Sequence, residues 1–439
     1  MIIDIKEAGL SFDFSHCFSD KGLTSPGLLA KSELSALSLI NSAALDEIDA
    51  IRQGKTLEHN EKALFLDLPF QNQDVTDSIK RRAEYIRNNC RYVISFGIGG
   101  SYLGSTALIQ AIKGLYYNLG NSCPKLFFLG NNLDPQTLRE VADLVEIDKL
   151  HLIIISKSGS TLEPLASFSY FYNLMKDAGL DITNRITIIT GSEKSILRTF
   201  GRKYSLHTMI MPENIGGRFS VLSVAGLLNS AVAGIDTDAL LRGARDSLDS
   251  FLAHDPGLNP ALLYAGTGYL FHKKGIDISV IMPYSDRLQH FGLWYIQLFS
   301  ESLGKKGIGR TPMLAVGTTD MHSQTQQHQE GRRDKCITFI QIEQFRDEIS
   351  VKPMPEPLGL YKGKFGELLK TACLANQRAL YEDSRPSCCI TMRRIEEKTL
   401  GSLIMFFEIS TVFEGIMLGI NPFDQPGVEQ YKKIMKEHL

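Results

Sequence analysis

Short apolar runs rich in β-branched residues alternate with helix-like stretches along this chain, and this alternation restricts the fold more than any other feature. One set of strand-like runs lies at 92–96, 125–129, 152–155 and 185–190. A second set, with a different sequence, lies at 277–282, 312–316, 336–340 and 388–392. Because strands that alternate with helices form parallel sheets with both faces covered, the chain is predicted to contain two α/β units.

The length agrees with more than one hydrophobic core, since 439 residues exceed the size at which a single core usually stops growing. We expect an N-terminal helical segment at 1–60, a first α/β domain at 61–205, a second α/β domain at 206–410 and a C-terminal helical tail at 411–439. Within the tail, the helical pattern breaks at 419–422, where a proline follows a glycine and an asparagine.

Composition argues against several classes of function. The formal net charge of −2 disfavours a polyanion as the main partner, because nucleic-acid binding needs a strong basic excess. The N-terminus lacks the basic start of a secretory signal, and no uninterrupted apolar run reaches the roughly 18 to 20 residues that span a bilayer. Seven cysteines without a C-x-x-C pair suggest neither a disulfide framework nor a structural zinc site. We therefore expect a cytoplasmic protein that binds neither nucleic acid nor membrane.

A polar segment joins the run at 152–155 to a helix-like stretch, and its residues are Ser156, Lys157, Ser158, Gly159, Ser160 and Thr161. Hydroxyl groups, one ammonium group and backbone N–H groups at a helix start can all bind an anion. The segment therefore predicts a phosphate site, in which Lys157 supplies charge and the hydroxyls supply adaptable donors. The alternative is a polar loop with an ordinary helix cap.

A glycine-rich turn at 97–104 joins the first predicted strand to a helix. It departs from a dinucleotide-binding turn, because Tyr102 stands at the sixth position of the G-x-G-x-x-G pattern and no acidic residue ends the second strand. A nucleotide-dependent oxidoreductase is therefore disfavoured. The backbone of this turn could still contact a sugar or phosphate oxygen, or the turn could serve only to pack a helix on the sheet.

Two further segments carry charged groups that could act in catalysis. Arg218 follows two glycines and precedes an apolar helical run at 221–233, so it could stabilise a developing oxyanion or could be a surface arginine near a turn. Gln297 and Glu301 lie four residues apart on one helix face with largely apolar neighbours. Glu301 is therefore either a candidate general base or a solvated glutamate on an amphipathic helix.

Histidines and a C-terminal lysine complete the set of candidates. His322 and His328 are six residues apart, which is not the i, i+4 spacing of a helical metal pair. One of them could transfer a proton near neutral pH, or either could be a structural histidine. Gln425 lies in a loop and Lys432 in a helical stretch, and composition alone gives neither a function.

Together these segments resemble the glucose-6-phosphate isomerase family in its shorter, bacterial-type form. The shared motifs are, in order, G-I-G-G-S, S-K-[ST]-x-[ST]-T, G-G-R-[FY]-S, Q-L-x-x-E-S-x-G-K, H-S-x-x-Q-x-x-Q-E-G and Q-x-G-V-E-x-x-K, and they span 97–432. Six weak patterns in one order are far more specific than any one of them.

The resemblance implies two sugar-isomerase-type α/β/α sandwich domains with parallel-rich sheets, assembled as a homodimer with shared active sites. It implies reversible conversion of glucose 6-phosphate to fructose 6-phosphate through a cis-enediol(ate), in glycolysis and gluconeogenesis. The substrate would be a small sugar phosphate, and no metal or other cofactor would be needed.

Roles carried over from the matching motifs are as follows. Glu301 would be the base that moves a proton between C2 and C1, and Arg218 would stabilise the enediolate. His322 would assist ring opening at the partner subunit's site, with Lys432 assisting. The phosphate would be held by Ser156, Lys157, Ser158 and Thr161, and the sugar would be lined by Gly100, Ser101, Gln297 and Gln425.

One departure and one alternative accompany this resemblance. At Ser158-Gly159-Ser160, longer members of the family have a threonine followed by a bulky residue, which bears on fine specificity rather than on the reaction. A non-catalytic regulator that binds sugar phosphates is the second interpretation. Glu301 discriminates between the two, because a protein that only binds its ligand has no need of a base.

Overall fold

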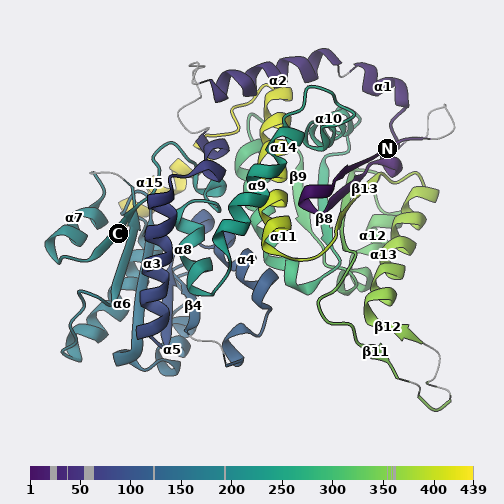
Figure 1. Cartoon of the computed structure of the whole chain (residues 1–439). Coiled ribbons are helices and arrows are strands. Elements are labelled where there is room, and N and C mark those ends of the chain that lie inside the picture. Colours follow the sequence, from purple (N-terminus) through teal and green to yellow (C-terminus); the bar gives the residue numbers. More distant parts are fainter. Residues whose placement is uncertain are drawn as a thin grey trace. The chain divides into compact units, whose positions relative to one another are not determined.

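The computed structural model describes residues 1–19, 27–36, 38–53, 64–121, 124–191, 194–352, 354–356, 358 and 362–438 (Figure 1). Its contacts group into two compact units. Unit 1 consists of Met1–Glu58 together with Gly243–Leu439, and unit 2 consists of His59–Arg242. This division falls at Arg242, whereas the domain boundary predicted from the sequence lies at 205/206.

Unit 2 is built, in its described part, on a five-stranded sheet with the order β4-β3-β5-β6-β7. The strands are β3 (Tyr92–Phe96), β4 (Lys125–Leu129), β5 (Leu150–Ser156), β6 (Ile186–Thr190) and β7 (His207–Ile210). Neighbouring strands pair in parallel, with Ile154 of β5 opposite both Phe96 and Ile188. The four strands predicted for this part of the chain are confirmed. Strand β7 was not predicted from the sequence; it has four residues, lies at the edge of the sheet and is only partly buried.

Helices cover both faces of this sheet. They are α3 (Gln73–Asn89), α4 (Leu103–Lys113), α5 (Pro135–Leu144), α6 (Leu162–Asp177), α7 (Ile196–Lys203) and α8 (Val224–Val232), and they are followed by α9 (Thr237–Phe251), which contains the division between the units. Every residue of β5 is buried, and because successive strand residues face opposite sides, both sides of β5 must be covered. This explains why the sequence at 152–155 is continuously apolar rather than alternating.

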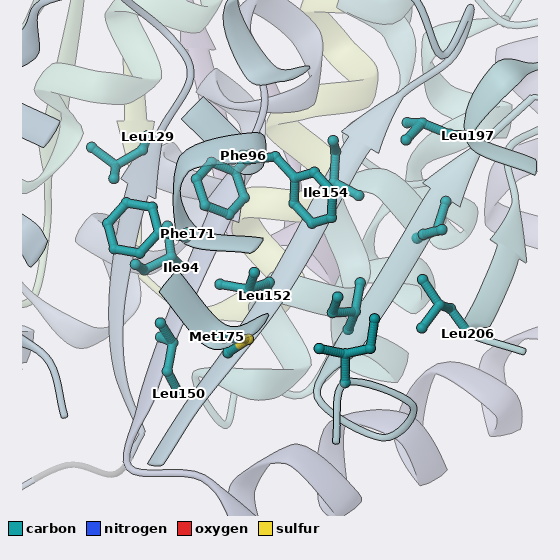
Figure 2. Packing of buried hydrophobic residues seen from close by; sticks show 14 of the residues in the cluster. Ile94, Phe96, Leu129, Leu150, Leu152, Ile154, Phe171, Met175, Leu197 and Leu206 are labelled. Atoms are coloured by element: carbon teal, nitrogen blue, oxygen red, sulfur yellow. The ribbon is translucent and has the colours of Figure 1, made fainter. Parts of the chain in front are cut away.

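The face of β5 that carries Leu152 and Ile154 packs against Phe171 and Met175 of α6 (Figure 2). The opposite face of the sheet contacts α3 and α8 through polar groups. Arg82 of α3 donates to the hydroxyl of Thr187 in β6 at 2.8 Å, and Asn229 of α8 donates to that of Ser95 in β3 at 2.9 Å.

Residues 206–242 make contacts with the residues that precede them in the chain. The division between the units therefore falls after this stretch. It supplies β7 to the sheet, and α8 packs on α3 and α4. The ammonium group of Lys113 at the end of α4 donates to the carbonyl of Gly234 at 2.7 Å. These contacts are non-local, so the local pattern of strands and helices does not reveal them.

Unit 1 contains, among the residues described, a six-stranded sheet with the order β1-β2-β13-β10-β8-β9. The strands are β1 (Ile2–Ile5), β2 (Leu10–Asp13), β8 (Ile278–Pro283), β9 (Thr311–Leu314), β10 (Lys335–Ile342) and β13 (Ser387–Met392). Strands β13, β10, β8 and β9 pair in parallel, which confirms the four strands predicted from the sequence. The hairpin of β1 and β2 pairs antiparallel with β13.

That hairpin corrects the expectation that 1–60 is a helical segment. Helices α1 (Lys31–Ala36) and α2 (Ser38–Arg52) do lie there, but two strands precede them. The strand signal is weak, because β1 has only four residues and its alternation of exposed and buried positions covers just two of each. Within the hairpin β1 pairs with β2, and β2 pairs in turn with β13, whose sequence lies almost at the other end of the chain.

The remaining elements of unit 1 include one long apolar helix. They are α10 (Pro260–Lys273), α11 (Gln289–Leu303), α12 (Thr325–Glu330), α13 (Phe365–Glu382), α14 (Glu397–Met417), α15 (Glu429–Glu437) and the short strands β11 (Ser350–Val351) and β12 (Gly363–Lys364). Helix α14 packs against α10, α11 and α2 (Figure 1).

By length and composition, α14 is the one helix in the described part of the chain that could cross a membrane, and 89% of its apolar window is buried within the structure. Glu408 and Glu414 interrupt the apolar sequence of this helix, so it contains no uninterrupted apolar run of that length. Such burial is typical of the core helix of a globular unit.

Candidate active site

The predicted phosphate segment forms a turn between β5 and α6. The Oγ of Ser156, a buried residue, lies 3.1 Å from the hydroxyl of Thr161 and accepts a hydrogen bond from the backbone N–H of Gly159 at 3.1 Å. Thr161 is the N-cap residue of α6, yet its side chain caps no N–H group among the described residues. The segment is therefore not an ordinary helix cap, and the positive end of α6 lies beside the hydroxyl groups.

Two residues beyond the segment hold it in place, and sequence reasoning did not identify either. Thr190, at the end of β6, donates to the backbone carbonyl of Ser156 at 2.7 Å, and its hydroxyl lies 2.5 Å from that of Ser195. Gly159 has a φ of +71°, and a Cβ there would lie 2.2 Å from the Oγ of Ser195. The segment thus needs a glycine at this position, both for its backbone and for its packing.

Lys157 makes hydrogen bonds within the protein that were not predicted from its role as a positive charge for the phosphate. Its ammonium group donates to the backbone carbonyl of Ile215 at 2.8 Å and to that of Glu213. Its own carbonyl accepts from the backbone N–H of Gly191 at 3.0 Å. Lys157 therefore ties the phosphate segment to the stretch that leads into Arg218.

The turn that carries Gly100 and Ser101 packs directly on the turn that carries Arg218. These turns are the 3₁₀ helices η5 (Gly99–Ser101) and η8 (Gly217–Phe219). A Cβ on Gly100 would lie 1.9 Å from the carbonyl oxygen of Gly217, so only glycine permits this approach of the two backbones. The glycine-rich turn thus brings Gly100 and Ser101 beside Arg218.

Arg218 is buried, with 1% of its surface exposed, which excludes the alternative of a surface arginine. Its guanidinium carbon lies 5.4 Å from the centre of the Phe219 ring. A positive charge in such surroundings acts on nearby negative charge more strongly than it would in water. The geometry of unit 2 therefore agrees with a role for Arg218 opposite an oxyanion.

In unit 1, α11 carries Gln297 and Glu301 one turn apart, as the spacing predicts. The Nε2 of Gln297 donates to the Oε1 of Glu301 at 2.9 Å, and both side chains are half-buried. The Oε1 of Gln297 is buried and has no hydrogen-bond partner among the described residues. If the amide of Gln297 were turned so that its oxygen faced Glu301, two oxygens would lie together without a hydrogen bond. The amide nitrogen therefore faces Glu301, and the amide oxygen is the atom left without a partner among the described residues. It could accept a hydrogen bond from a ligand hydroxyl.

The two histidines of the 322–331 segment differ in exposure. His322, at the end of η10 (Thr319–His322), is exposed. His328 is buried, neither ring nitrogen has a partner among the described residues, and burial lowers its pKa to about 4. His328 therefore stays neutral near pH 7, which leaves the exposed His322 as the candidate for proton transfer.

The C-terminal candidates lie in and after a loop that follows α14. Gln425 is half-buried and precedes η11 (Pro426–Val428). Lys432 lies on α15, where its ammonium group forms an ion pair with Glu429 of the same helix at 3.1 Å. Asp424, which directly precedes Gln425, forms an ion pair with Lys305, and Lys305 follows α11. Lys305 closes one of the motifs noted in the sequence, but the sequence did not indicate its partner.

The sequence-predicted residues thus fall into one set per unit. Unit 2 brings together Gly100, Ser101, Ser156, Lys157, Ser158, Thr161 and Arg218 through the contacts of its turns. Unit 1 holds Gln297, Glu301, His322, Gln425 and Lys432. Among these, the structure shows a direct contact between Gln297 and Glu301, and it connects the loop of Gln425 to the end of their helix.

Comparison with known proteins adds an independent finding. The family model described as "Phosphoglucose isomerase" matches residues 73–324 and 362–438. The "Probable glucose-6-phosphate isomerase" of Methanococcus maripaludis is 34% identical over 385 residues, which cover 88% of this chain and 86% of that protein. The "Glucose-6-phosphate isomerase" of Rubrobacter xylanophilus is 36% identical over 379 residues, covering 84% and 87%.

Solved structures resemble the whole chain. A protein of Thermus thermophilus, described as hypothetical, aligns with a TM-score of 0.83 and 29% identity, covering 98% of this chain and 99% of that one. A glucose-6-phosphate isomerase of Chlamydia trachomatis aligns with a TM-score of 0.82 and 22% identity, covering 100% and 89%. At this identity the second likeness shows the fold.

The contact between the two turns leads to a stability prediction. We expect Gly100→Ala to lower the free energy of unfolding by about 1 to 3 kcal/mol, because the new methyl group clashes with a backbone carbonyl that cannot rotate away. Gly217→Ala is the matched control, since the nearest described atom would lie 4.0 Å from its Cβ. Thermal unfolding of both variants measures this, and equal melting temperatures would contradict the assignment.

Proposed function

Because the chain belongs to the phosphoglucose isomerase family, we propose how its own residues divide the interconversion of glucose 6-phosphate and fructose 6-phosphate. This aldose–ketose isomerisation, a step of glycolysis and gluconeogenesis, is the protein's activity. The reaction moves one proton from C2 to C1 of the open-chain sugar and one from the C2 hydroxyl to the C1 oxygen. It needs a base, a means of stabilising the intermediate and a hold on the phosphate.

Glu301 is the base in this proposal, and the contact with Gln297 is the observation that carries it. The amide holds one carboxylate oxygen at 2.9 Å and thereby fixes the orientation of the carboxylate. The other oxygen can take the proton from C2 and return it to C1 on the same face of the sugar. The orphaned Oε1 of Gln297 supports a sugar hydroxyl as the group that completes its hydrogen bonds.

The unit 2 residues act on the two anionic groups. Arg218 faces the cis-enediolate oxygen that forms after the first proton transfer, where a buried cation lowers the energy of developing charge. The phosphate binds to the hydroxyls of Ser156, Ser158 and Thr161, to the start of α6 and to Lys157. Since the phosphate takes no part in the chemistry, its binding energy serves to hold the reacting carbons in place.

His322 assists opening of the sugar ring, with Lys432 in support. This step moves a proton between the ring oxygen and the C1 hydroxyl, and the imidazole of the exposed His322 can carry that proton. Gln425, together with Gly100 and Ser101, lines the sugar. A regulator that only binds sugar phosphates would have no use for this combination of base and proton-transfer groups.

We also propose that two copies of the chain form a homodimer in which His322 acts at the partner's active site. Exposed apolar side chains that flank the paired strands β11 and β12 support an interface there. Ile349 and Phe365 are 66% and 58% exposed, and a backbone hydrogen bond of 2.9 Å joins them. Large adjacent apolar side chains on a surface favour a protein partner. The cytoplasmic location expected from the sequence remains a prediction.

Replacing the base tests the proposed chemistry. We expect Glu301→Gln to lower kcat by about 10² or more, because the amide keeps the shape of the side chain but cannot accept the proton. A coupled assay of fructose 6-phosphate formation measures this. Glu382→Gln is the control, since Glu382 is exposed and pairs with Arg378 on α13. Near wild-type turnover in a folded Glu301→Gln enzyme would disprove the assignment.

Removing the ammonium group of the phosphate segment tests substrate binding. We expect Lys157→Ala to raise KM by about tenfold or more, because a charge-assisted hydrogen bond to phosphate is lost. The constant for inhibition by inorganic phosphate should rise in parallel. Lys176→Ala, which changes an exposed lysine at the other end of α6, should leave both constants unchanged. A change in kcat alone would mean that Lys157 does not bind the phosphate.

Mixing two inactive variants tests the shared site. In a dimer of one Glu301→Gln chain and one His322→Gln chain, a shared arrangement leaves one site with both wild-type residues. A refolded equimolar mixture should therefore regain about a quarter of wild-type activity, as two-fold symmetry requires. Activity no higher than the average of the two variants would place both residues in one chain's site. Sedimentation velocity on the wild-type chain decides whether the dimer exists.

A further inference from the structure

The loop that follows α11 carries three cations, Lys305, Lys306 and Arg310, and each contacts α14 or the segment after it. Arg310 forms a bidentate pair with Glu414 of α14 at 2.9 and 2.8 Å, and both side chains are buried. Lys306 lies 3.5 Å from the carbonyl oxygen of Gly419. The end of the helix that carries Glu301 is thus joined to the end of α14 by charged groups.

Lys305 makes the contact that reaches furthest toward the C-terminus. Its side chain is 9% exposed, and its ammonium nitrogen lies 2.9 Å from the Oδ1 of Asp424. It also donates to the backbone carbonyl of Asn421. The Oδ1 of Asp424 is shielded from solvent, although 47% of that side chain is exposed. A buried ammonium group is costly without partners, so Lys305 constrains the positions of 421–424.

We infer that Lys305 is a positioning residue for the isomerisation, and this rests on the function proposed above. Lys305 lies four residues beyond Glu301, and Asp424 directly precedes Gln425. The ion pair therefore fixes the loop that carries Gln425, and the start of the path to Lys432, relative to the helix that carries the base. Through this ion pair, Lys305 sets the distance between the carboxylate of Glu301 and the groups that bind the sugar and open its ring. Lys305 itself need not touch the substrate.

The neighbouring cations do not offer the same constraint. Lys306 is exposed, and its contact with a carbonyl at 3.5 Å is at the limit of a hydrogen bond. Arg310 holds α14 rather than the loop after it. Lys306 is therefore a matched control that differs from Lys305 by one position in the chain.

Steady-state kinetics of five variants tests this inference. We expect Lys305→Met and Asp424→Asn to lower kcat about tenfold each with less than about a threefold change in KM, because misplacement near the reacting atoms affects the transition state most. The double variant should be no slower than the slower single one, since both remove one interaction. Lys305→Arg should recover part of the rate, and Lys306→Met should match the wild type.

Two sets of results would overturn the inference. If Lys305→Met and Lys306→Met have equal kcat values, the ion pair does not position the catalytic groups. If Lys305→Met loses thermal stability with kcat unchanged, the ion pair is only structural; Asp424→Asn, on the exposed side of the pair, gives the same answer should Lys305→Met fail to fold. A wild-type chain without isomerase activity, or a fully active Glu301→Gln variant, would instead refute the proposed function itself.

Discussion

Parallel pairing of the strands determines where the candidate functional groups of each unit can lie. In a parallel sheet, all strands end at the same edge, and the chain must return through a crossover before the next strand begins. In unit 2, the ends of β3 and β5 are therefore neighbours, with Phe96 opposite Ile154. The glycine-rich turn and the phosphate segment follow these two strands directly. Their common edge explains why backbone space is scarce there and why Gly100 and Gly159 have no room for a side chain.

Burial of charge is the second constraint, and it acts in unit 1. Helix α14 is almost entirely buried, and it buries Glu414 against Arg310. Burial alone would lower the pKa of Arg310, but the adjacent carboxylate of Glu414 outweighs it and raises that pKa, so the guanidinium group remains charged. A buried pair of this kind adds little net stability compared with apolar side chains, whereas removal of one partner costs about 3 to 5 kcal/mol. The pair of Arg310 and Glu414 thereby restricts the position of the loop after α11 relative to α14.

Sequence reasoning succeeded where the signal is local. The strands with apolar, β-branched runs were predicted in both sheets. It did not find β1, β2 and β7, which are short and depend on partners elsewhere in the chain. The candidate residues came from motifs. Their contacts, such as the bond from Lys157 to Ile215 and the pair of Lys305 with Asp424, join residues whose separation carries no local signal.

Burial in the fold, finally, separates residues that the sequence cannot rank. A carboxylate among apolar neighbours is the pattern that suggested Glu301, and by that criterion Glu408 on α14 is the stronger candidate. The structure reverses this order. Glu408 is fully buried, neither of its oxygens has a partner among the described residues, and burial raises its pKa well above the usual value. Burial therefore favours the neutral form of this carboxyl group, which cannot accept a proton as a base does. Glu301 is half-buried and its Oε1 accepts from Gln297, which restricts the orientation of the carboxylate. An apolar setting alone does not make a general base; the carboxylate must also be accessible to the carbon whose proton it removes.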